Sequence, residues 1–212
     1  MKKCSHLFLN DKFLIPKNVM SMKVLRDRIL ADGICLEGGI LKVDRFLNHQ
    51  LDIHLMKQIA VEFLRRFSDL QVNKIVTIES SGIAPSVMLG YMMELPVVFA
   101  KKQLPSTLHD AFFTTVHSFT KQRDTHLLVS REFLSPGDHV LFIDDFLAYG
   151  NAAKAINDIC CQAGATVEGM GFVIEKEMLH ARQLLRSEGI NRIESLAIVD
   201  SLENGVIHFK ED

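Results

Sequence analysis

Two adjacent carboxylates, Asp144 and Asp145, are the residues of this sequence best suited to chemistry. They follow four apolar residues at positions 140–143, a run that is too short for a buried helix and typical of a strand buried on both faces. Gly150 then precedes a predicted helix, whose free N–H groups and positive dipole end favour an anion. Carboxylates for hydroxyl groups or a metal, next to a helix N-terminus for a phosphate, together indicate a ribose-phosphate site.

The order of buried strand, Asp-Asp, glycine loop and helix resembles the phosphoribosyl-pyrophosphate signature of type I phosphoribosyltransferases. The resemblance implies that Asp144 and Asp145 are the catalytic residues and hold the ribose hydroxyls, directly or through Mg2+. It also implies that the following segment, here called the phosphate loop, wraps the 5'-phosphate of the substrate with Ala148, Tyr149, Gly150, Asn151 and Ala152. The alternatives for the paired acids are a response-regulator-like domain and a solvated turn at a strand end.

The phosphate loop departs from the common family pattern. Tyr149 and Asn151 flank Gly150, where the family usually carries Thr or Ser hydroxyls. This version resembles the xanthine phosphoribosyltransferase branch, whose loop is closer to Asn-Gly-Gln. Tyr149 is the unusual residue, and it leaves more of the phosphate contact to backbone amides.

A second anion-binding turn is predicted after a first core strand at residues 74–78. Small polar residues precede a helix that has Pro85 in its first turn, a position where proline is tolerated. The turn resembles the pyrophosphate loop of the family, which implies that Ser80, Ser81 and Gly82 bind phosphoribosyl pyrophosphate. Lys102, at the end of a short buried strand predicted at 96–100, is a further candidate for the same substrate. Ordinary helix caps and surface lysines are the alternatives.

The segment before the core resembles the small N-terminal hood that closes over the purine ring in xanthine phosphoribosyltransferases. Residues 22–50 contribute to this hood, with a helix at 22–32 followed by a turn, a short strand and a loop. By the resemblance, Leu41 packs on the base and Asn48 hydrogen-bonds its edge. The alternatives are that Leu41 belongs to the core and that Asn48 caps the amphipathic helix that follows.

The rest of the chain predicts an α/β fold with an open, mostly parallel, twisted sheet and helices on both faces. A mobile loop is predicted at 103–111, and the family resemblance implies that it closes over the substrate as a lid. Residues 112–119 and 125–130 are predicted to form an antiparallel pair. A helix that ends at Gly164 precedes a strand at 168–174, which delivers Lys176 to the same edge of the sheet as Asp144. Lys176 matches the family lysine that recognises the 6-oxo group of the base. A helix to about residue 188 and strands at 193–199 and 206–209 complete the fold.

Composition excludes several classes of protein. The 212 residues carry a net charge of −2, with a pI near 6.5, so no basic surface for nucleic acid is indicated. No apolar run approaches the roughly 18 to 20 residues of a membrane span. The four cysteines, Cys4, Cys35, Cys160 and Cys161, lack metal-ligand spacing and favour a reducing cytoplasm. Residues 1–21 are interpreted as an extension of unknown role before a single domain at 22–212.

The resemblance runs from about residue 22 to the end and is strongest at 41–50, 74–85, 118–122 and 143–153. It implies a cytoplasmic, Mg2+-dependent, homodimeric enzyme that converts xanthine and phosphoribosyl pyrophosphate to xanthosine 5'-monophosphate and pyrophosphate for purine salvage. The same reaction on guanine or hypoxanthine is the nearest alternative. A non-catalytic regulator that senses phosphoribosyl pyrophosphate and binds DNA is a third, although residues 1–21 are too few for a helix-turn-helix module.

Overall fold

A computed structural model describes residues 22–103, 110–118, 123–203 and 205–210 of the chain. The N-terminal segment 1–21 lies outside the described residues, as do most of the predicted lid at 103–111 and residues 119–122. The described ranges contain no helix that is long and apolar enough to cross a membrane.

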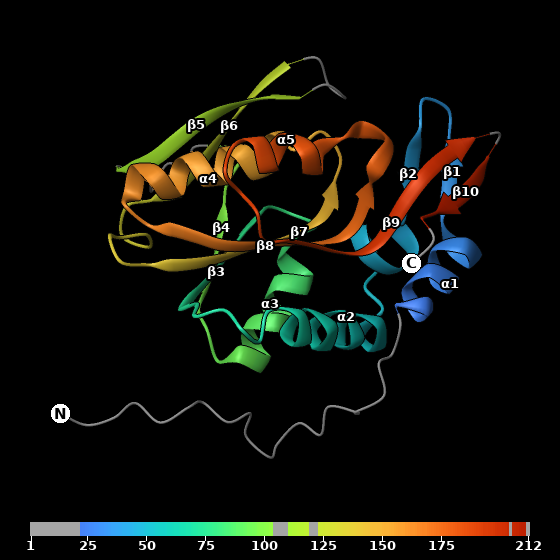
Figure 1. Ribbon diagram of the computed structural model, residues 1–212, viewed down its shortest axis with the longest axis horizontal. Coiled ribbons are helices and arrows are strands. Elements are labelled where there is room, and N and C mark those ends of the chain that lie inside the picture. The colour runs from blue at the N-terminus through green and yellow to red at the C-terminus, as the bar shows by residue number, and fades with distance from the viewer. Residues whose placement is uncertain (1–21, 104–109, 119–122, 204, 211–212) are drawn as a thin grey trace.

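A six-stranded sheet forms the centre of the molecule, and Figure 1 shows how it twists. Its strand order is β10-β9-β8-β7-β3-β4, and every neighbouring pair is parallel except β10 and β9. The strands are β3 (Lys74–Ile78), β4 (Val97–Ala100), β7 (His139–Leu147), β8 (Thr166–Lys176), β9 (Ile193–Glu203) and β10 (Val206–Phe209). The predicted open, mostly parallel sheet is confirmed.

Helices cover both faces of the sheet, as the alternation of strand and helix patterns predicts (Figure 1). One face is covered by α2 (Ile53–Arg66) and α3 (Ile83–Met93), and the other by α4 (Asn151–Ala163) and α5 (Ala181–Ser187). Each layer encloses its own apolar core: Phe63 of α2 and its C-cap residue Phe67 are fully buried on one side, and Ile156 and Ile159 of α4 on the other. Burial of these apolar side chains holds the helices against the sheet.

The N-terminal hood consists of α1 (Lys23–Asp32), the hairpin of β1 (Ile34–Leu36) and β2 (Ile40–Lys42), and a single π-helical turn, η1 (Asp44–Asn48). It packs at the carboxyl end of β8, because the Lys176 ammonium donates to the Gly39 carbonyl in the hairpin turn at 2.9 Å. The cap of the following helix is Asp52, whose side chain accepts from the Leu55 amide at 3.1 Å. The alternative of Asn48 as this cap is therefore wrong.

A two-stranded antiparallel ribbon of β5 (Ala111–Ser118) and β6 (Arg123–Ser130) forms the pair predicted for this region. It continues from the central sheet, since the Lys101 and Leu128 backbones exchange two hydrogen bonds of 2.9 Å. Figure 1 shows the ribbon rising on the side of the sheet that α4 covers. The ribbon thus forms a wall beside the carboxyl ends of the strands.

Two strand predictions require correction. Strand β7 does not stop at Asp144 but continues to Leu147, because β8 pairs with it up to Leu147 and Glu175 and so supplies backbone partners. Strand β4 is not buried, since it lies at the edge of the sheet and Phe99 is exposed. An edge strand has a neighbour on one side alone, which the short apolar run could not reveal.

Candidate active site

The candidate site lies where the direction of chain winding reverses in the sheet. The chain passes from β3 to β4 on one side and from β7 to β8 on the other, so β3 and β7 are neighbours at the switch point. Their pairing ends at Val76 and Phe142, and beyond these residues the two strands separate. Open α/β sheets bind ligands in the crevice that this separation creates at the carboxyl ends of the strands.

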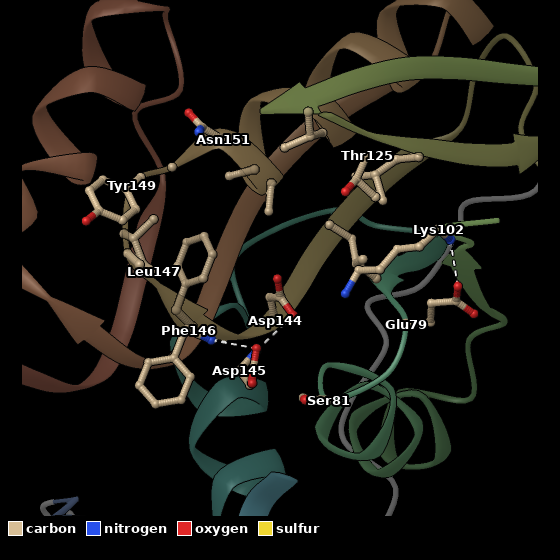
Figure 2. Close-up of a pocket in the computed structure, with 18 of the residues that line it drawn as sticks. Glu79, Ser81, Lys102, Thr125, Asp144, Asp145, Phe146, Leu147, Tyr149 and Asn151 are labelled. Carbon is tan, nitrogen blue, oxygen red and sulfur yellow. Dashed lines mark hydrogen bonds between the residues drawn. The ribbon is translucent and has the colours of Figure 1, made fainter. Parts of the chain in front are cut away.

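A cavity of about 600 Å³ occupies this crevice (Figure 2). Its lining comes from the end of β7, the phosphate loop, the start of α4, the turn after β3, the segment after β4 and the β5-β6 ribbon. Of the residues predicted to bind phosphoribosyl pyrophosphate or to act in catalysis, those that line it are Ser80, Ser81, Lys102, Asp144, Asp145, Ala148, Tyr149, Gly150, Asn151 and Ala152. Gly82, the remaining one, lies directly against Asp144. The structure therefore brings together residues that are far apart in the sequence.

The two carboxylates are held by the backbone of β7. The Asp145 amide donates to Asp144 Oδ1 at 3.0 Å, and the Phe146 amide donates to Asp145 Oδ1 at 2.9 Å. Burial, followed by the charge of Asp145, raises the pKa of the Asp144 carboxyl well above its ordinary value. The Lys102 ammonium, whose side chain points toward Asp144 in Figure 2, opposes that rise in pKa. Burial also raises the pKa of Asp145. The pair thus forms an acidic site, with Asp144 buried and Asp145 partly buried, that favours a cation.

The phosphate loop ends in a helix N-terminus that is open to the cavity. Gly150 has φ +80°, a left-handed conformation that glycine adopts at little cost, and it begins α4 without a side-chain cap. The first N–H groups of a helix have no partner within the helix, so they are available to an anion. Tyr149 is 44% exposed, and Figure 2 shows its ring directed away from the two carboxylates. The loop therefore offers backbone amides to an anion at the start of α4.

The turn at residues 80–82, here called the pyrophosphate turn, is tied to both neighbouring strands. Glu79 accepts from the Lys102 amide at 2.6 Å through Oε1, and its own amide donates to the Ala100 carbonyl at 3.0 Å. The peptide bond between Glu79 and Ser80 is cis. A Cβ added at Gly82 would lie 2.5 Å from Asp144 Oδ1, so the turn packs directly on the carboxylate.

The three residues predicted to bind the base do not line this cavity, but two of them adjoin residues that do. Burial raises the pKa of Asp145, and a hydrogen bond from the Asn48 side chain is among the contacts that oppose this rise. The Lys176 ammonium lies 5.7 Å from the centre of the Phe146 ring, and burial lowers its pKa. Leu41 is 5% exposed and packs in the apolar core beneath the hood, the position given by its core alternative.

Several residues of the site escaped the sequence interpretation. Phe146 follows the acids and faces Lys176, and Thr125 and Leu127 of β6 line the wall of the cavity. Beside Lys176, the buried Glu175 carboxylate accepts from Arg182 at 2.5 Å, and Arg182 also donates to the Ile193 carbonyl at 2.8 Å. The alternation of β7 could have indicated Phe146. The other contacts join distant segments, and no local pattern signals them.

Comparison with known proteins agrees with this geometry. No family model matches the chain. Proteins named xanthine phosphoribosyltransferase from Pseudomonas aeruginosa and Ectopseudomonas mendocina are 51% and 52% identical over 189 residues, which is 89% of this chain and 99% of each relative. One from Ligilactobacillus salivarius is 47% identical over 190 residues, or 89% of this chain and 98% of the relative.

Solved structures share the fold at lower identity. The adenine phosphoribosyltransferase of Rhodothermus marinus matches with a TM-score of 0.70 and 21% identity, covering 86% of this chain and all of that one. The Giardia lamblia enzyme, solved with 9-deazaadenine, matches with a TM-score of 0.65 and 21% identity, over 76% of this chain and 87% of that one. The relatives show more than a fold, because they are about half identical to this chain over nearly their whole length. The chain therefore belongs to the xanthine phosphoribosyltransferase family.

Proposed function

We propose that this protein transfers the phosphoribosyl group of phosphoribosyl pyrophosphate to xanthine, which yields xanthosine 5'-monophosphate and pyrophosphate. One observation carries the proposal: a single cavity joins two adjacent carboxylates, one of them buried, to two turns that each precede a helix. The family of the chain agrees with it, since the relatives are named for this activity. The physiological role would be purine salvage.

The cavity divides into regions that match the parts of the sugar substrate. The free amides at the start of α4 suit the 5'-phosphate, and Asp144 and Asp145 suit the ribose hydroxyls, which donate to carboxylates. The pyrophosphate turn and Lys102 lie on the opposite side of the carboxylates and suit the pyrophosphate group (Figure 2). During transfer, positive charge develops on the anomeric carbon while pyrophosphate departs with negative charge. Hydrogen-bond donors and Lys102 on one side stabilise the negative charge of the pyrophosphate, and the carboxylates near the sugar stabilise the positive charge.

The hood region suits the base. Lys176 donates one of its three ammonium hydrogens to Gly39, so two remain for the 6-oxo group of an oxopurine. A 6-amino purine would instead present a donor to this ammonium, and an unmatched buried donor pair costs on the order of 1–3 kcal/mol. Asn48 joins the hood to Asp145 and is placed to read the edge of the base from there. The family resemblance gives Leu41 an apolar contact with the base, whereas its burial in the core beneath the hood favours a packing role.

Mg2+ fits the donor set of the site. It prefers oxygen ligands, which Asp144 and Asp145 supply, and a cation here would offset the mutual repulsion and burial of the two carboxyls. In the described part of the chain, no group of three or more acidic, histidine or cysteine side chains gathers into a metal site. The metal would therefore take its other ligands from the substrate and water. When bound, it would neutralise charge on the departing pyrophosphate.

The remaining expectations are part of the same proposal: a homodimer in the cytoplasm that acts on small molecules, without nucleic acid or membrane partners. The pI near 6.5 supports the absence of a nucleic-acid partner. The carboxylate pair and the surrounding anion sites favour catalysis over a sensing regulator. Guanine or hypoxanthine as the preferred base is the alternative, because both carry the 6-oxo group.

The test is an absorbance assay with phosphoribosyl pyrophosphate and Mg2+, in which xanthine, guanine, hypoxanthine and adenine are offered separately. We expect the highest kcat/KM with xanthine and the lowest with adenine. Asp145→Asn is the matched negative control, because it keeps the shape of the side chain and removes its charge. Preference for guanine or hypoxanthine would refute the choice of base alone. No turnover of any base, combined with a shift of promoter DNA in a gel, would favour the regulator.

A further inference from the structure

Thr77, near the end of β3, has a hydroxyl group that the proposed function does not yet use. The side chain is fully buried, and its Oγ1 has no hydrogen-bond partner among the described residues. It is the single hydroxyl in that condition within the described ranges, where the other two unpaired buried atoms belong to arginines. A buried hydroxyl without a partner is unfavourable for folding, so its presence calls for a physical reason.

The hydroxyl is located beneath the pyrophosphate turn and beside a catalytic carboxylate. A Cβ added at Gly82 would meet Thr77 Oγ1 at 2.2 Å and Asp144 Oδ1 at 2.5 Å. Both oxygens therefore converge on the same point next to the Gly82 backbone, and they are neighbours. Three parts of the proposed site meet here: the strand end of β3, the turn for pyrophosphate and the carboxylate for ribose.

The chemistry of the two groups is complementary. Asp144 Oδ1 accepts one hydrogen bond, from the Asp145 amide at 3.0 Å, and a carboxylate oxygen has room for a second. The Thr77 hydroxyl is a donor that rotates freely to suit its acceptor. A hydrogen bond from a hydroxyl to a carboxylate is among the stronger ones in proteins, so a small shift that joins them would be favourable.

We propose that Thr77 is a positioning residue for phosphoribosyl transfer, whose hydroxyl donates to Asp144 when phosphoribosyl pyrophosphate is bound and orients that carboxylate toward the ribose. The inference rests on the proposed function. Binding of the substrate to the pyrophosphate turn and to Asp144 supplies the small shift that brings the donor and the acceptor together. In the free protein the Thr77 hydroxyl has no hydrogen-bond partner among the described residues, and this lowers the stability of the free protein.

Stability alone would select a different residue at this position. Valine has the same shape as threonine, favours strands and carries no polar group to bury. The neighbours of Thr77 in β3, Ile75, Val76 and Ile78, are all apolar and buried. Threonine in place of valine therefore indicates a role other than packing.

Two variants test the inference, Thr77→Val and Thr77→Ser. Thr77→Val should weaken the binding of phosphoribosyl pyrophosphate with Mg2+, measured by calorimetry, by about tenfold to a hundredfold, as expected for a lost hydrogen bond to a charged group. It should raise the KM for phosphoribosyl pyrophosphate, or lower kcat, while the KM for xanthine changes less than about threefold. The unfolding temperature of the free protein should stay the same or rise. Thr77→Ser should restore binding.

Ser86→Ala is the matched control. Ser86 is also fully buried, but its hydroxyl has a partner, the Ile143 carbonyl at 3.5 Å. This variant should lower the unfolding temperature and retain substrate binding, the reverse of Thr77→Val. If the wild type is active, this inference would be overturned by either of two results: Thr77→Val binds phosphoribosyl pyrophosphate as tightly as the wild type, or Thr77→Val is clearly less stable than the wild type. Failure of the wild type to bind phosphoribosyl pyrophosphate would overturn the proposed function and this inference together.

Discussion

Gly82→Ala is the substitution whose consequence follows most directly from the structure. Gly82 has φ −70° and ψ −17°, an ordinary conformation for alanine, so the backbone itself resists nothing. The added methyl group would nevertheless lie 2.2 Å from Thr77 Oγ1, 2.5 Å from Asp144 Oδ1 and 3.3 Å from Asp144 Cα. Gly82→Ala should therefore disturb the site because the new methyl group clashes with the Asp144 carboxylate and the Thr77 hydroxyl.

The size of the effect can be estimated from these contacts. Carbon and oxygen atoms do not approach so closely, so the two side-chain oxygens must retreat by about 1 Å. A displacement of that size at a reacting group costs about a hundredfold in turnover, which is roughly 3 kcal/mol of barrier. Overpacking lowers the free energy of unfolding by about 1–3 kcal/mol. Alanine also reduces the conformational entropy of the unfolded chain, which raises the free energy of unfolding by about 0.4–1 kcal/mol. The unfolding temperature should fall by only a few degrees.

The assay is kcat/KM for phosphoribosyl pyrophosphate at saturating xanthine, together with thermal unfolding of the free protein. Gly189→Ala is the control, because Gly189 has φ +88°, follows α5 and has no atom within 4 Å of an added Cβ. Alanine at that φ costs about 1–2 kcal/mol of stability, but turnover should remain normal. The pair of variants thus separates damage to the site from general loss of stability. Near-normal turnover of Gly82→Ala would refute the packing of the pyrophosphate turn on Asp144 in the working enzyme.

Three further predictions concern recognition of the base, the pH dependence of stability and the buried ion pair of Glu175 with Arg182. Lys176→Ala should raise the KM for xanthine at least about tenfold and that for phosphoribosyl pyrophosphate far less, because a charged hydrogen bond to the base is lost; equal changes in steady-state kinetics would remove Lys176 from the base site. Burial holds the pKa of Asp144 well above its ordinary value, so the folded chain binds more protons than the unfolded one and stability falls as pH rises. Asp144→Asn should therefore raise the unfolding temperature of the free protein at neutral pH, and the gain should vanish below about pH 4; a gain independent of pH would contradict this cause. Arg182→Met should cost about 3–5 kcal/mol in urea unfolding, because it leaves the buried Glu175 carboxylate unpaired; a loss below about 1 kcal/mol would be inconsistent with that pairing.

Local features of the sequence were sufficient to identify much of the fold and many of the residues that line the cavity. The apolar run before Asp144 predicts a buried strand, and the glycine at 150 predicts the helix start that follows it. Since parallel strands bring their carboxyl ends to one edge, the pyrophosphate turn, Lys102 and the phosphate loop could be assigned to one cavity. These inferences succeed because strand and helix periodicity, turns and helix starts are properties of short segments.

The extent of individual strands was less predictable. Asp144 and Asp145 lie within β7 and not after it, because β8 is long enough to pair with the residues beyond them. Strand β4 reads as buried from its composition, but its place at the edge of the sheet exposes Phe99. In both cases the neighbouring strand decides the outcome, and the sequence of a strand does not specify its neighbour.

By itself, the sequence determined the family, the order of elements and most of the residues that line the cavity. Tertiary structure alone decided which groups touch across the site: Asn48 meets Asp145, Lys176 meets both Gly39 and the Phe146 ring, and Glu175 pairs with Arg182. It also left the Thr77 hydroxyl buried beside Asp144 without a partner. Such contacts join segments that only folding brings together, and burial sets the charge of their groups, so no pattern along the chain could reveal them.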